Sequence, residues 1–408
     1  MPKLRKINQD NLREHNLSIV MQTLLSAGHP MSRADFAKST GLTKAAMSML
    51  SEILIRNNIF CQLTPVADST YGRPSTPLSF CSRHWAGIGL QVDTSGYGFT
   101  VLDLAGGSVH TEWVSAAMVD VTPEDIFSKL DRMIQPVEKE LKALGYTVCG
   151  AGLAVPGLVK DRSVLLGARN LGWKDVDLRR FDVVSRLNAI AVNEADVAAV
   201  AQIPGYAAAP IASPAMLDTE SSFIYLSTDV GISGAVVSQG KVMEGEHHFA
   251  GEIGHLSVDW NGPQCPCGRR GCLEQYAGRR ALVEAAGIAT GAESASMDSV
   301  NRLLSAWHAR NERAVKAINR GLAAMASGLC SAVNLLDIHT IVLGGFWTNF
   351  TDTVAKKLEK RIQEHALGRD AMDISVLVAP VPDHPALRGA ATVGLRELID
   401  HPMRFIHT

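Results

Sequence analysis

The sequence has 408 residues, of which 46% are hydrophobic, 20% are charged and seven are cysteine, and its formal net charge is −2. A chain of this length is expected to form two or three domains, and its composition excludes the disordered, collagen-like and disulfide-dense classes of protein. No apolar run approaches the roughly 18 to 20 residues of a membrane helix, and the polar first residues lack the apolar centre of a signal peptide, so we expect a cytoplasmic protein without membrane insertion.

The charge is unevenly distributed along the chain. Residues 1–83 hold ten basic and five acidic side chains, whereas the remainder holds 29 basic and 36 acidic side chains. A small basic head followed by an acidic body suggests that the head, residues 1–82, contacts a polyanion and that the body does not.

Three helices are predicted in the head. An amphipathic pattern predicts a helix over 11–27, and a second helix over 33–39 follows the N-cap candidate Ser32. Gly41 provides a turn, after which Thr43 can cap a third, longer helix. This spacing is typical of a helix-turn-helix.

A hairpin completes the head, because segments 59–64 and 78–81 have strand character and the tip between them contains Arg73. Such a hairpin would be a wing, with an arginine suited to a narrow minor groove, while the start of the third helix would meet base edges in the major groove. The alternative is a dimerisation or packing module. The turn spacing, the basic charge and the wing arginine together favour a DNA-binding module instead. The candidate DNA-contacting residues are Arg33, Thr43, Lys44, Ala46, Ser48, Met49 and Arg73.

From Trp85 onward, strands alternate with helices, which predicts α/β lobes. The expected strands cover 87–92, 99–103, 106–114, 148–155, 189–192, 223–227, 235–237, 340–343 and 374–377. The expected helices cover 123–145, 194–202, 281–286, 300–336 and 352–367. The first three strands would form an antiparallel meander, and the stretch 208–220, rich in alanine, proline and serine, is expected to be a surface loop.

The sharpest chemical signal is a group of metal-binding residue types within 18 positions. It consists of His255, Cys265, Cys267 and Cys272. One imidazole and three thiolates can supply a tetrahedral set, and a site with four protein ligands has no open position for water, so we expect a structural zinc ion. Reduced cysteines without a metal are the alternative, and His247 and His248 are competing ligands that lie farther away.

A metal at this point would fix the loop beside Glu252 and Glu274. These two carboxylates, the free side of His255 and an upstream asparagine would suit the vicinal hydroxyls of a sugar. The carboxylates could instead pair with arginines such as Arg269 or Arg279, and the residue pattern alone supports both interpretations equally.

Seven motifs make the sequence resemble the ROK family of repressors, open reading frames and kinases. They are Val155-Pro156-Gly157, Asn170-Leu171-Gly172-Trp173, Asn193-Glu194-Ala195-Asp196, Gly231-Ile232-Ser233-Gly234, Gly251 to His255, the cysteine cluster with Glu274, and Gly389-Ala390-Ala391. The resemblance covers nearly the whole chain, head included, and is stronger to the sugar-responsive repressors of the family than to its free-standing kinases.

The resemblance implies an α/β protein in which a winged helix-turn-helix, residues 1–82, precedes a two-lobed actin-like or ribonuclease-H-like sugar-binding domain. Lobe 1 would comprise residues 83–195, completed by the C-terminal helix at 385–408, and lobe 2 would comprise residues 196–384 with the structural zinc site. By position, the residues that hold the sugar between the lobes would be Asn170, Asn193, Glu194, Glu252, His255 and Glu274.

The sequence departs from the kinases of the family at three places. Their Asp-x-Gly-Gly-Thr-like turn approaches the ATP phosphates, whereas this chain has Asp93-Thr94-Ser95-Gly96-Tyr97, without paired glycines. Ser233 stands where the second phosphate loop usually has glycine, and Glu194 stands at the position of the catalytic aspartate, one methylene longer. Because a base displaced by about 1 Å can lose on the order of 10²-fold in rate, we expect binding without phosphoryl transfer and assign no catalytic residue.

Together these observations predict a sugar-responsive transcriptional repressor. We expect a homodimer, or a dimer of dimers, that binds operator DNA and releases it when a sugar or sugar phosphate closes the cleft. One alternative is an ATP-dependent hexose or N-acetylhexosamine kinase that carries a DNA-binding head. The other is a repressor titrated by a sugar-transporter subunit.

Overall fold

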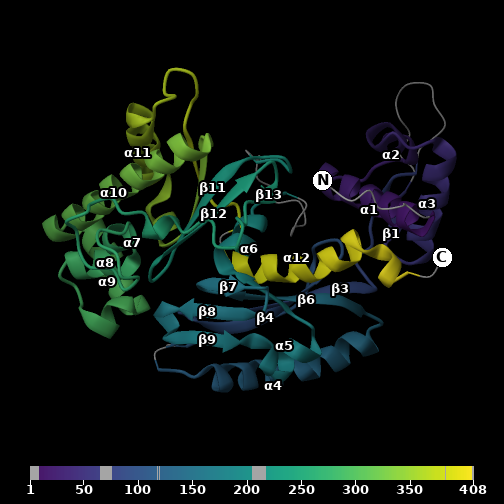
Figure 1. Cartoon of the computed structure of the whole chain (residues 1–408), viewed down its shortest axis with the longest axis horizontal. Coiled ribbons are helices and arrows are strands. Elements are labelled where there is room, and N and C mark those ends of the chain that lie inside the picture. Colours follow the sequence, from purple (N-terminus) through teal and green to yellow (C-terminus); the bar gives the residue numbers. More distant parts are fainter. Residues whose placement is uncertain are drawn as a thin grey trace.

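The computed structural model describes residues 9–64, 76–116, 118, 120–204, 217–381 and 383–406. They form a mixed α/β structure with one two-stranded, one three-stranded and two five-stranded sheets. The head lies at one end of the long axis of the molecule and the helices of lobe 2 lie at the other end (Figure 1). Within the described residues, the helices are all too short or too polar to cross a membrane.

Lobe 1 contains a five-stranded sheet with the strand order β10-β6-β3-β4-β5. Its strands are β3 (Trp85–Asp93), β4 (Gly96–Asp103), β5 (Ser108–Ser115), β6 (Thr147–Val155) and β10 (Ile190–Asn193). The predicted antiparallel meander is confirmed in β3, β4 and β5, while β6 and β10 continue the sheet in parallel. Helix α12 (Pro385–Asp400) packs on one face and α4 (Pro123–Ala143) lies on the other side (Figure 1).

Helix α12 approaches this sheet closely because the strands carry glycine beneath it. A Cβ atom at Gly89 in β3 would lie 2.3 Å from the carbonyl oxygen of Leu387 and 2.5 Å from the amide nitrogen of Ala391. Both atoms belong to the backbone of α12, so a side chain at this position would push the helix off the sheet.

A three-stranded antiparallel sheet extends lobe 1 toward lobe 2, and the sequence analysis did not predict it. It consists of β7 (Leu158–Lys160), β8 (Val164–Ala168) and β9 (Trp173–Asp177). The short helix η1 (Arg169–Leu171) joins β8 to β9, and three more short helical segments come after β9: η2 (Leu178–Arg180), α5 (Asp182–Arg186) and α6 (Glu194–Val200).

Lobe 2 contains the second five-stranded sheet, with the order β13-β12-β11-β14-β15. Its strands are β11 (Phe223–Thr228), β12 (Ile232–Ser238), β13 (Lys241–Val242), β14 (Thr340–Gly345) and β15 (Ser375–Val378). Its helical segments are η3 (Ile253–His255), α7 (Glu274–Ala277), α8 (Arg279–Ala285), η4 (Gly291–Ala295), α9 (Met297–His308), α10 (Glu312–Leu336), η5 (Phe346–Phe350) and α11 (Thr351–His365). Of the predicted loop over 208–220, residues 208–216 lie outside the described residues.

The single helix predicted over 300–336 is wrong, because the structure divides this region into α9 and α10. Arg310 has a left-handed backbone conformation with a φ of 57°. Asn311 then caps α10, since its side chain accepts hydrogen bonds from the amides of Arg313 and Ala314. The apolar periodicity continues across this turn and hides the break.

The head has the three predicted helices and the predicted strand pair. Its elements are α1 (Gln9–Ala27), α2 (Arg33–Thr40), α3 (Lys44–Arg56), β1 (Phe60–Gln62) and β2 (Leu78–Phe80). Ser32 forms a capping box with Asp35, Gly41 ends α2 in the left-handed region with a φ of 71°, and Thr43 caps α3. These local signals fix the short turn between α2 and α3.

The hydrophobic core of the head is continuous with the body. Leu17 of α1 and Leu50 of α3 are buried in the same cluster as Leu395 of α12. The side chain of Gln22 also donates a hydrogen bond to Asp400 at 3.1 Å. The head therefore rests on α12, and its own apolar core continues into that of the body (Figure 1).

A disulfide joins two cysteines for which the sequence analysis proposed no partner. Cys61 in β1 is bonded to Cys81, which follows β2, with the two Cα atoms 5.2 Å apart. The bond closes the loop that contains Arg73, which itself lies outside the described residues. Cys149 and Cys330 are buried and free.

Candidate functional site

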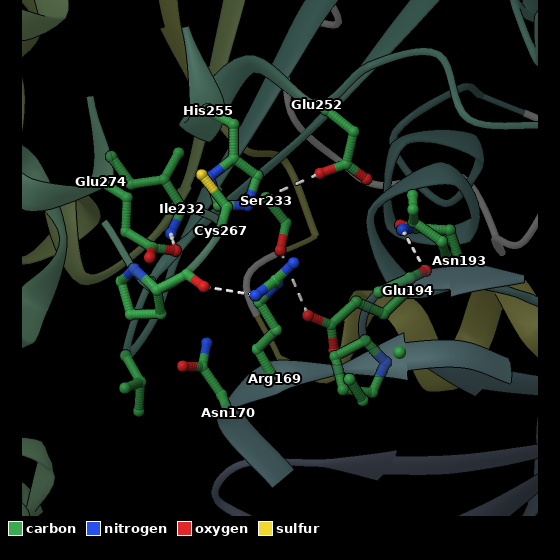
Figure 2. Close-up of a pocket in the computed structure, with 18 of the residues that line it drawn as sticks. Arg169, Asn170, Asn193, Glu194, Ile232, Ser233, Glu252, His255, Cys267 and Glu274 are labelled. Atoms are coloured by element: carbon green, nitrogen blue, oxygen red, sulfur yellow. Dashed lines mark hydrogen bonds and ion pairs between the residues drawn. The ribbon is translucent and has the colours of Figure 1, made fainter. Parts of the chain in front are cut away.

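A cavity of about 350 Å³ is lined by residues of both lobes. Lobe 1 contributes η1 and the turn after β6, and lobe 2 contributes the β11–β12 turn and the loop that holds the cysteine cluster. All six residues predicted to hold a sugar line this one cavity, and Figure 2 shows them: Asn170, Asn193, Glu194, Glu252, His255 and Glu274.

Asn193 ends β10 and caps α6. Its Oδ1 accepts a hydrogen bond from the amide of Ala195 at 2.7 Å, and its Nδ2 donates to the carbonyl oxygen of Gly157 at 3.0 Å. Because an amide side chain has two acceptor and two donor positions, one of each stays available toward the cavity. Asn193 thus positions the wall of the cavity and retains some capacity to bind a ligand.

Glu194 is the first residue of α6 and lies close to other carboxylates. Its Oε1 accepts a hydrogen bond from the hydroxyl of Ser233 at 3.3 Å. Burial, followed by the charges of Asp93 and Asp229, raises the pKa of Glu194 from 4.5 to about 8. Its carboxyl group is therefore mostly protonated at neutral pH, the state in which it cannot accept a proton from a substrate hydroxyl.

The pKa of Glu194 predicts a pH-dependent stability that Glu194→Gln should reduce. The folded chain keeps a proton that the unfolded chain releases above pH 4.5, so the stability from this proton is complete below pH 4.5 and is lost as the pH rises to about 8. We expect the thermal midpoint of the glutamine variant to fall by a few degrees less than that of the parent between about pH 5 and pH 9. Circular dichroism measures these thermal midpoints. If the midpoint fell equally in both proteins, the result would contradict the raised pKa of Glu194.

Glu274 and Glu252 approach the cavity from lobe 2. Glu274 accepts a hydrogen bond from the amide of Ile232 at 3.2 Å, and a Cβ atom at Gly231 would lie 2.1 Å from its Oε2, so a side chain at Gly231 would displace this carboxylate. Burial raises the pKa of Glu252, which lies 4.0 Å from Nε2 of His255. Neither carboxylate forms an ion pair with Arg279, which the sequence analysis had considered as a partner.

The ligand atoms of the predicted metal site lie within 4.8 Å of one another. They belong to His255, Cys265, Cys267 and Cys272. Nδ1 of His255 faces the sulfur of Cys265 at 3.7 Å, which leaves Nε2 facing Glu252. Three convergent thiols and one imidazole are a donor set that fits a tetrahedral metal ion and leaves no place for a substrate.

Besides the hydrogen bond from Ser233 to Glu194, three polar contacts between described residues connect the two lobes around the cavity. Arg169 of η1 donates a hydrogen bond to the carbonyl oxygen of Pro266, between two of the clustered cysteines. Arg162 forms an ion pair with Glu244 at 3.1 Å, outside the residues that line the cavity. Arg169 is not among the residues predicted to line the site, although a basic residue directly before Asn170 is visible in the sequence.

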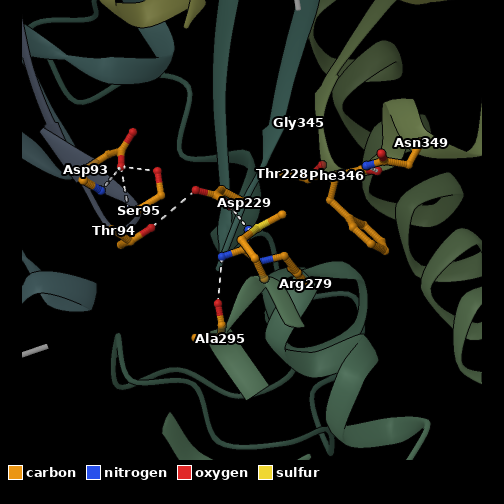
Figure 3. A network of polar contacts seen from close by, with 12 residues as sticks. Asp93, Thr94, Ser95, Thr228, Asp229, Arg279, Ala295, Gly345, Phe346 and Asn349 are labelled. Carbon is orange, nitrogen blue, oxygen red and sulfur yellow. Dashed lines mark hydrogen bonds and ion pairs between the residues drawn. The ribbon is translucent and has the colours of Figure 1, made fainter. Parts of the chain in front are cut away.

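The third contact centres on Asp229 (Figure 3). Thr94 of the β3–β4 turn donates a hydrogen bond to Oδ2 of Asp229 at 3.4 Å, and Arg279 pairs with Oδ1 at 2.6 Å. In the same turn of lobe 1, the amides of Ser95 and Gly96 donate to the carboxylate of Asp93. The amides of Ser95 and Gly96 thus already donate to a protein carboxylate. The β11–β12 turn on the other side contributes the carboxylate of Asp229.

The candidate DNA-contacting residues of the head differ in exposure. Thr43, Lys44, Ser48 and Met49 are exposed, whereas Arg33 and Ala46 are half-buried. The hydroxyl of Thr43 accepts from the amide of Ala46 at 3.2 Å, so this residue acts as the helix cap. Arg73 lies outside the described residues, and its predicted contact stays a prediction.

Comparisons with known proteins cover most of the chain. Residues 88–397 match the model of the ROK family. A putative xylose repressor of Caldicellulosiruptor sp. (strain Rt8B.4) is 26% identical over 411 residues, which cover 97% of this chain and 99% of that protein. A glucokinase of Halalkalibacterium halodurans is 27% identical over 235 residues, which cover 54% of this chain and 68% of that protein. The crystal structure of a ROK family transcriptional regulator, described as a homologue of the E. coli MLC protein, has 20% identity and a TM-score of 0.75, covering 97% of this chain and 98% of that one.

Proposed function

Because this chain belongs to the ROK family, we propose that it is a transcriptional repressor that binds operator DNA with its head and a sugar effector in the cavity between its lobes. The observation that carries this proposal is the extent of the similarity. The putative xylose repressor aligns over 97% of the chain, head included, whereas the glucokinase aligns over 54%.

We assign residues 1–82 to a winged helix-turn-helix, and the described part of the head supports this assignment. A short capped turn joins α2 to α3, and α3 presents Lys44, Ser48 and Met49 to solvent. Small polar and methyl-bearing side chains at the start of such a helix can read base edges in the major groove. A homodimer, or a dimer of dimers, would place two heads on successive half-sites.

The body supplies the sensor. We assign residues 83–195 with 385–408 to lobe 1 and residues 196–384 to lobe 2, and we assign zinc to the Cys₃His cluster as a structural ion. The effector would contact both lobes and favour the arrangement in which they are closed, and a coupling of about 1 to 3 kcal/mol would change operator affinity roughly 5- to 150-fold.

A sugar kinase is the second candidate, favoured by the similarity to the glucokinase. The geometry gives it little support, because in the β3–β4 turn the amides of Ser95 and Gly96 already donate to Asp93 and are not free to bind the phosphates of ATP. Burial raises the pKa of Glu194, at the position of the kinase base, to about 8, which favours the protonated form that cannot act as a base. An assay of ADP formation with a panel of sugars tests this candidate, and turnover near 1 s⁻¹ or faster would establish it.

Selection of bound DNA from a random library tests the proposed function. We expect a palindromic site whose affinity falls steeply with salt and is weakened by one sugar among glucose, xylose, N-acetylglucosamine, N-acetylmannosamine and their 6-phosphates. A monomer without salt-sensitive DNA binding would contradict the proposal. DNA binding that no sugar changes, and that a sugar-transporter subunit relieves, would identify a repressor titrated by a protein.

Arg73→Ala tests the division of labour between head and body. We expect operator affinity to fall roughly 5- to 150-fold, since one charged groove contact is lost, while sugar affinity stays the same. Fluorescence anisotropy of labelled operator and calorimetry with the sugar measure the two properties separately. Equal damage to both would mean that the wing assignment is wrong.

A further inference from the structure

We infer that the effector is an anionic sugar, one that carries a phosphate or a carboxylate, and that Arg169 binds its charged group at the cavity. This inference rests on the proposed function, because it names the class of effector for the same cavity. It starts from a guanidinium group that the sequence analysis had not assigned to any role.

Arg169 lines the cavity beside Asn170, and Figure 2 shows its guanidinium group among the candidate sugar-binding side chains. Its hydrogen bond goes to a neutral acceptor, the carbonyl oxygen of Pro266. Arg169 is exposed at the cavity, and within the described residues it forms no ion pair, although three glutamates line the same cavity. One of its five N–H donors is used, so the others remain for a ligand.

Two carboxylates that line the cavity have charged or hydrogen-bonding partners in the protein. Glu274 accepts from the amide of Ile232, and Asp229 is paired with Arg279. These acids have protein donors, whereas Arg169 has a positive charge without a protein anion. A guanidinium in this state binds phosphate or carboxylate through two parallel hydrogen bonds, which a neutral hydroxyl group cannot supply.

A second guanidinium borders the cavity from the opposite lobe. Arg269 lines it, is exposed, and lies close enough to Glu252 for its charge to oppose the rise in the pKa of that carboxyl. Arg269 belongs to the same tight loop as Pro266, because its carbonyl oxygen accepts from the amide of Cys265 at 2.8 Å. An anion held by Arg169 and Arg269 would connect lobe 1 to lobe 2, which is what an effector must do to favour closure.

Matched pairs of ligands test the inference by calorimetry on the full chain. The panel contains glucose, glucose 6-phosphate and glucuronate, then N-acetylglucosamine and its 6-phosphate, with inorganic phosphate alone. We expect one anionic sugar to bind at least about 10-fold more tightly than its neutral parent, with a difference that shrinks at high salt. The phosphate and uronate arms show which anion the site accepts.

Arg169→Gln should abolish this preference, so that the ratio of anionic to neutral affinity falls to near one, and Arg169→Lys should restore it in part because lysine keeps the charge without the planar fork. Arg162→Gln is the matched control, since it removes an ion pair between the lobes outside the cavity. Its ratio should equal that of the parent protein. The thermal midpoint of each variant verifies that it is folded.

Three outcomes would overturn the inference. If the neutral parent binds as tightly as its anionic derivative, the effector class is wrong while the proposed function stands. If the preference survives in Arg169→Gln, or is lost equally in Arg162→Gln, Arg169 only connects the lobes. If no ligand of the panel binds and none changes operator binding, both the inference and the sugar-sensing part of the proposed function are wrong.

Discussion

On the proposed function, Cys267→Ser is expected to lose the capacity to bind a metal ion and, with it, the response of DNA binding to sugar. Cys267 provides one of four ligand atoms that lie within 4.8 Å of one another, and Cys267 itself lines the cavity. Structural zinc contributes on the order of 10 kcal/mol to folding in small peptides, so loss of a ligand should disorder the surrounding loop. Metal analysis should show less than one ion per chain, and calorimetry should show a loss of sugar affinity of about 100-fold or more.

Cys330→Ser is the matched control for this experiment. Cys330 is a buried free cysteine of α10 and is not one of the clustered residues. The control should retain the ion and the sugar response, even if the new hydroxyl lowers its stability. A metal-free Cys267→Ser protein with a full sugar response would refute the link between the ion and the cavity.

Gly89→Ala is expected to give the second large effect, a loss of about 3 kcal/mol or more in the free energy of unfolding. The added methyl group would lie 2.3 Å from the carbonyl oxygen of Leu387 and 2.5 Å from the amide nitrogen of Ala391. These atoms are part of the α12 backbone and cannot move independently of the helix. Unfolding in urea, followed by circular dichroism, measures the change.

Gly167→Ala is the corresponding control in β8. A Cβ atom at Gly167 would meet no atom within 4 Å, so this substitution should change the free energy of unfolding by less than about 1 kcal/mol. Gly89→Ala should also weaken DNA binding, because α12 carries part of the core of the head. Equal stability of the two variants would mean that α12 can shift on the sheet without cost.

Much of the fold could be predicted because its signals are local. The capping box of Ser32 and Asp35 and the left-handed Gly41 define the α2–α3 turn in a few residues. The ligand spacing from His255 to Cys272 predicted a metal site, and its ligand atoms do converge. The six candidate sugar-binding residues, chosen by resemblance, line one cavity.

The features of the fold and the site that the sequence did not predict depend on contacts between segments that are distant along the chain. The hairpin of β1 and β2 was predicted, but the disulfide between Cys61 and Cys81 was not, because it depends on the two Cα atoms coming to 5.2 Å across the pair. The contact of Arg169 with Pro266 exists only once the lobes are placed side by side. The ion pair of Asp229 with Arg279 likewise joins two turns of lobe 2, and sequence reasoning could list partners for Arg279 but could not choose among them.

The packing of the head on α12 has a consequence for how the protein is made. Gln22 and Asp400, which form a hydrogen bond, are 378 positions apart, so a ribosome completes the head long before it synthesises the helix that the head rests on. A nascent or prematurely terminated chain therefore displays the apolar residues of α1 that would otherwise pack near α12. Exposed apolar surface of this kind makes such fragments prone to aggregation until the last helix is made.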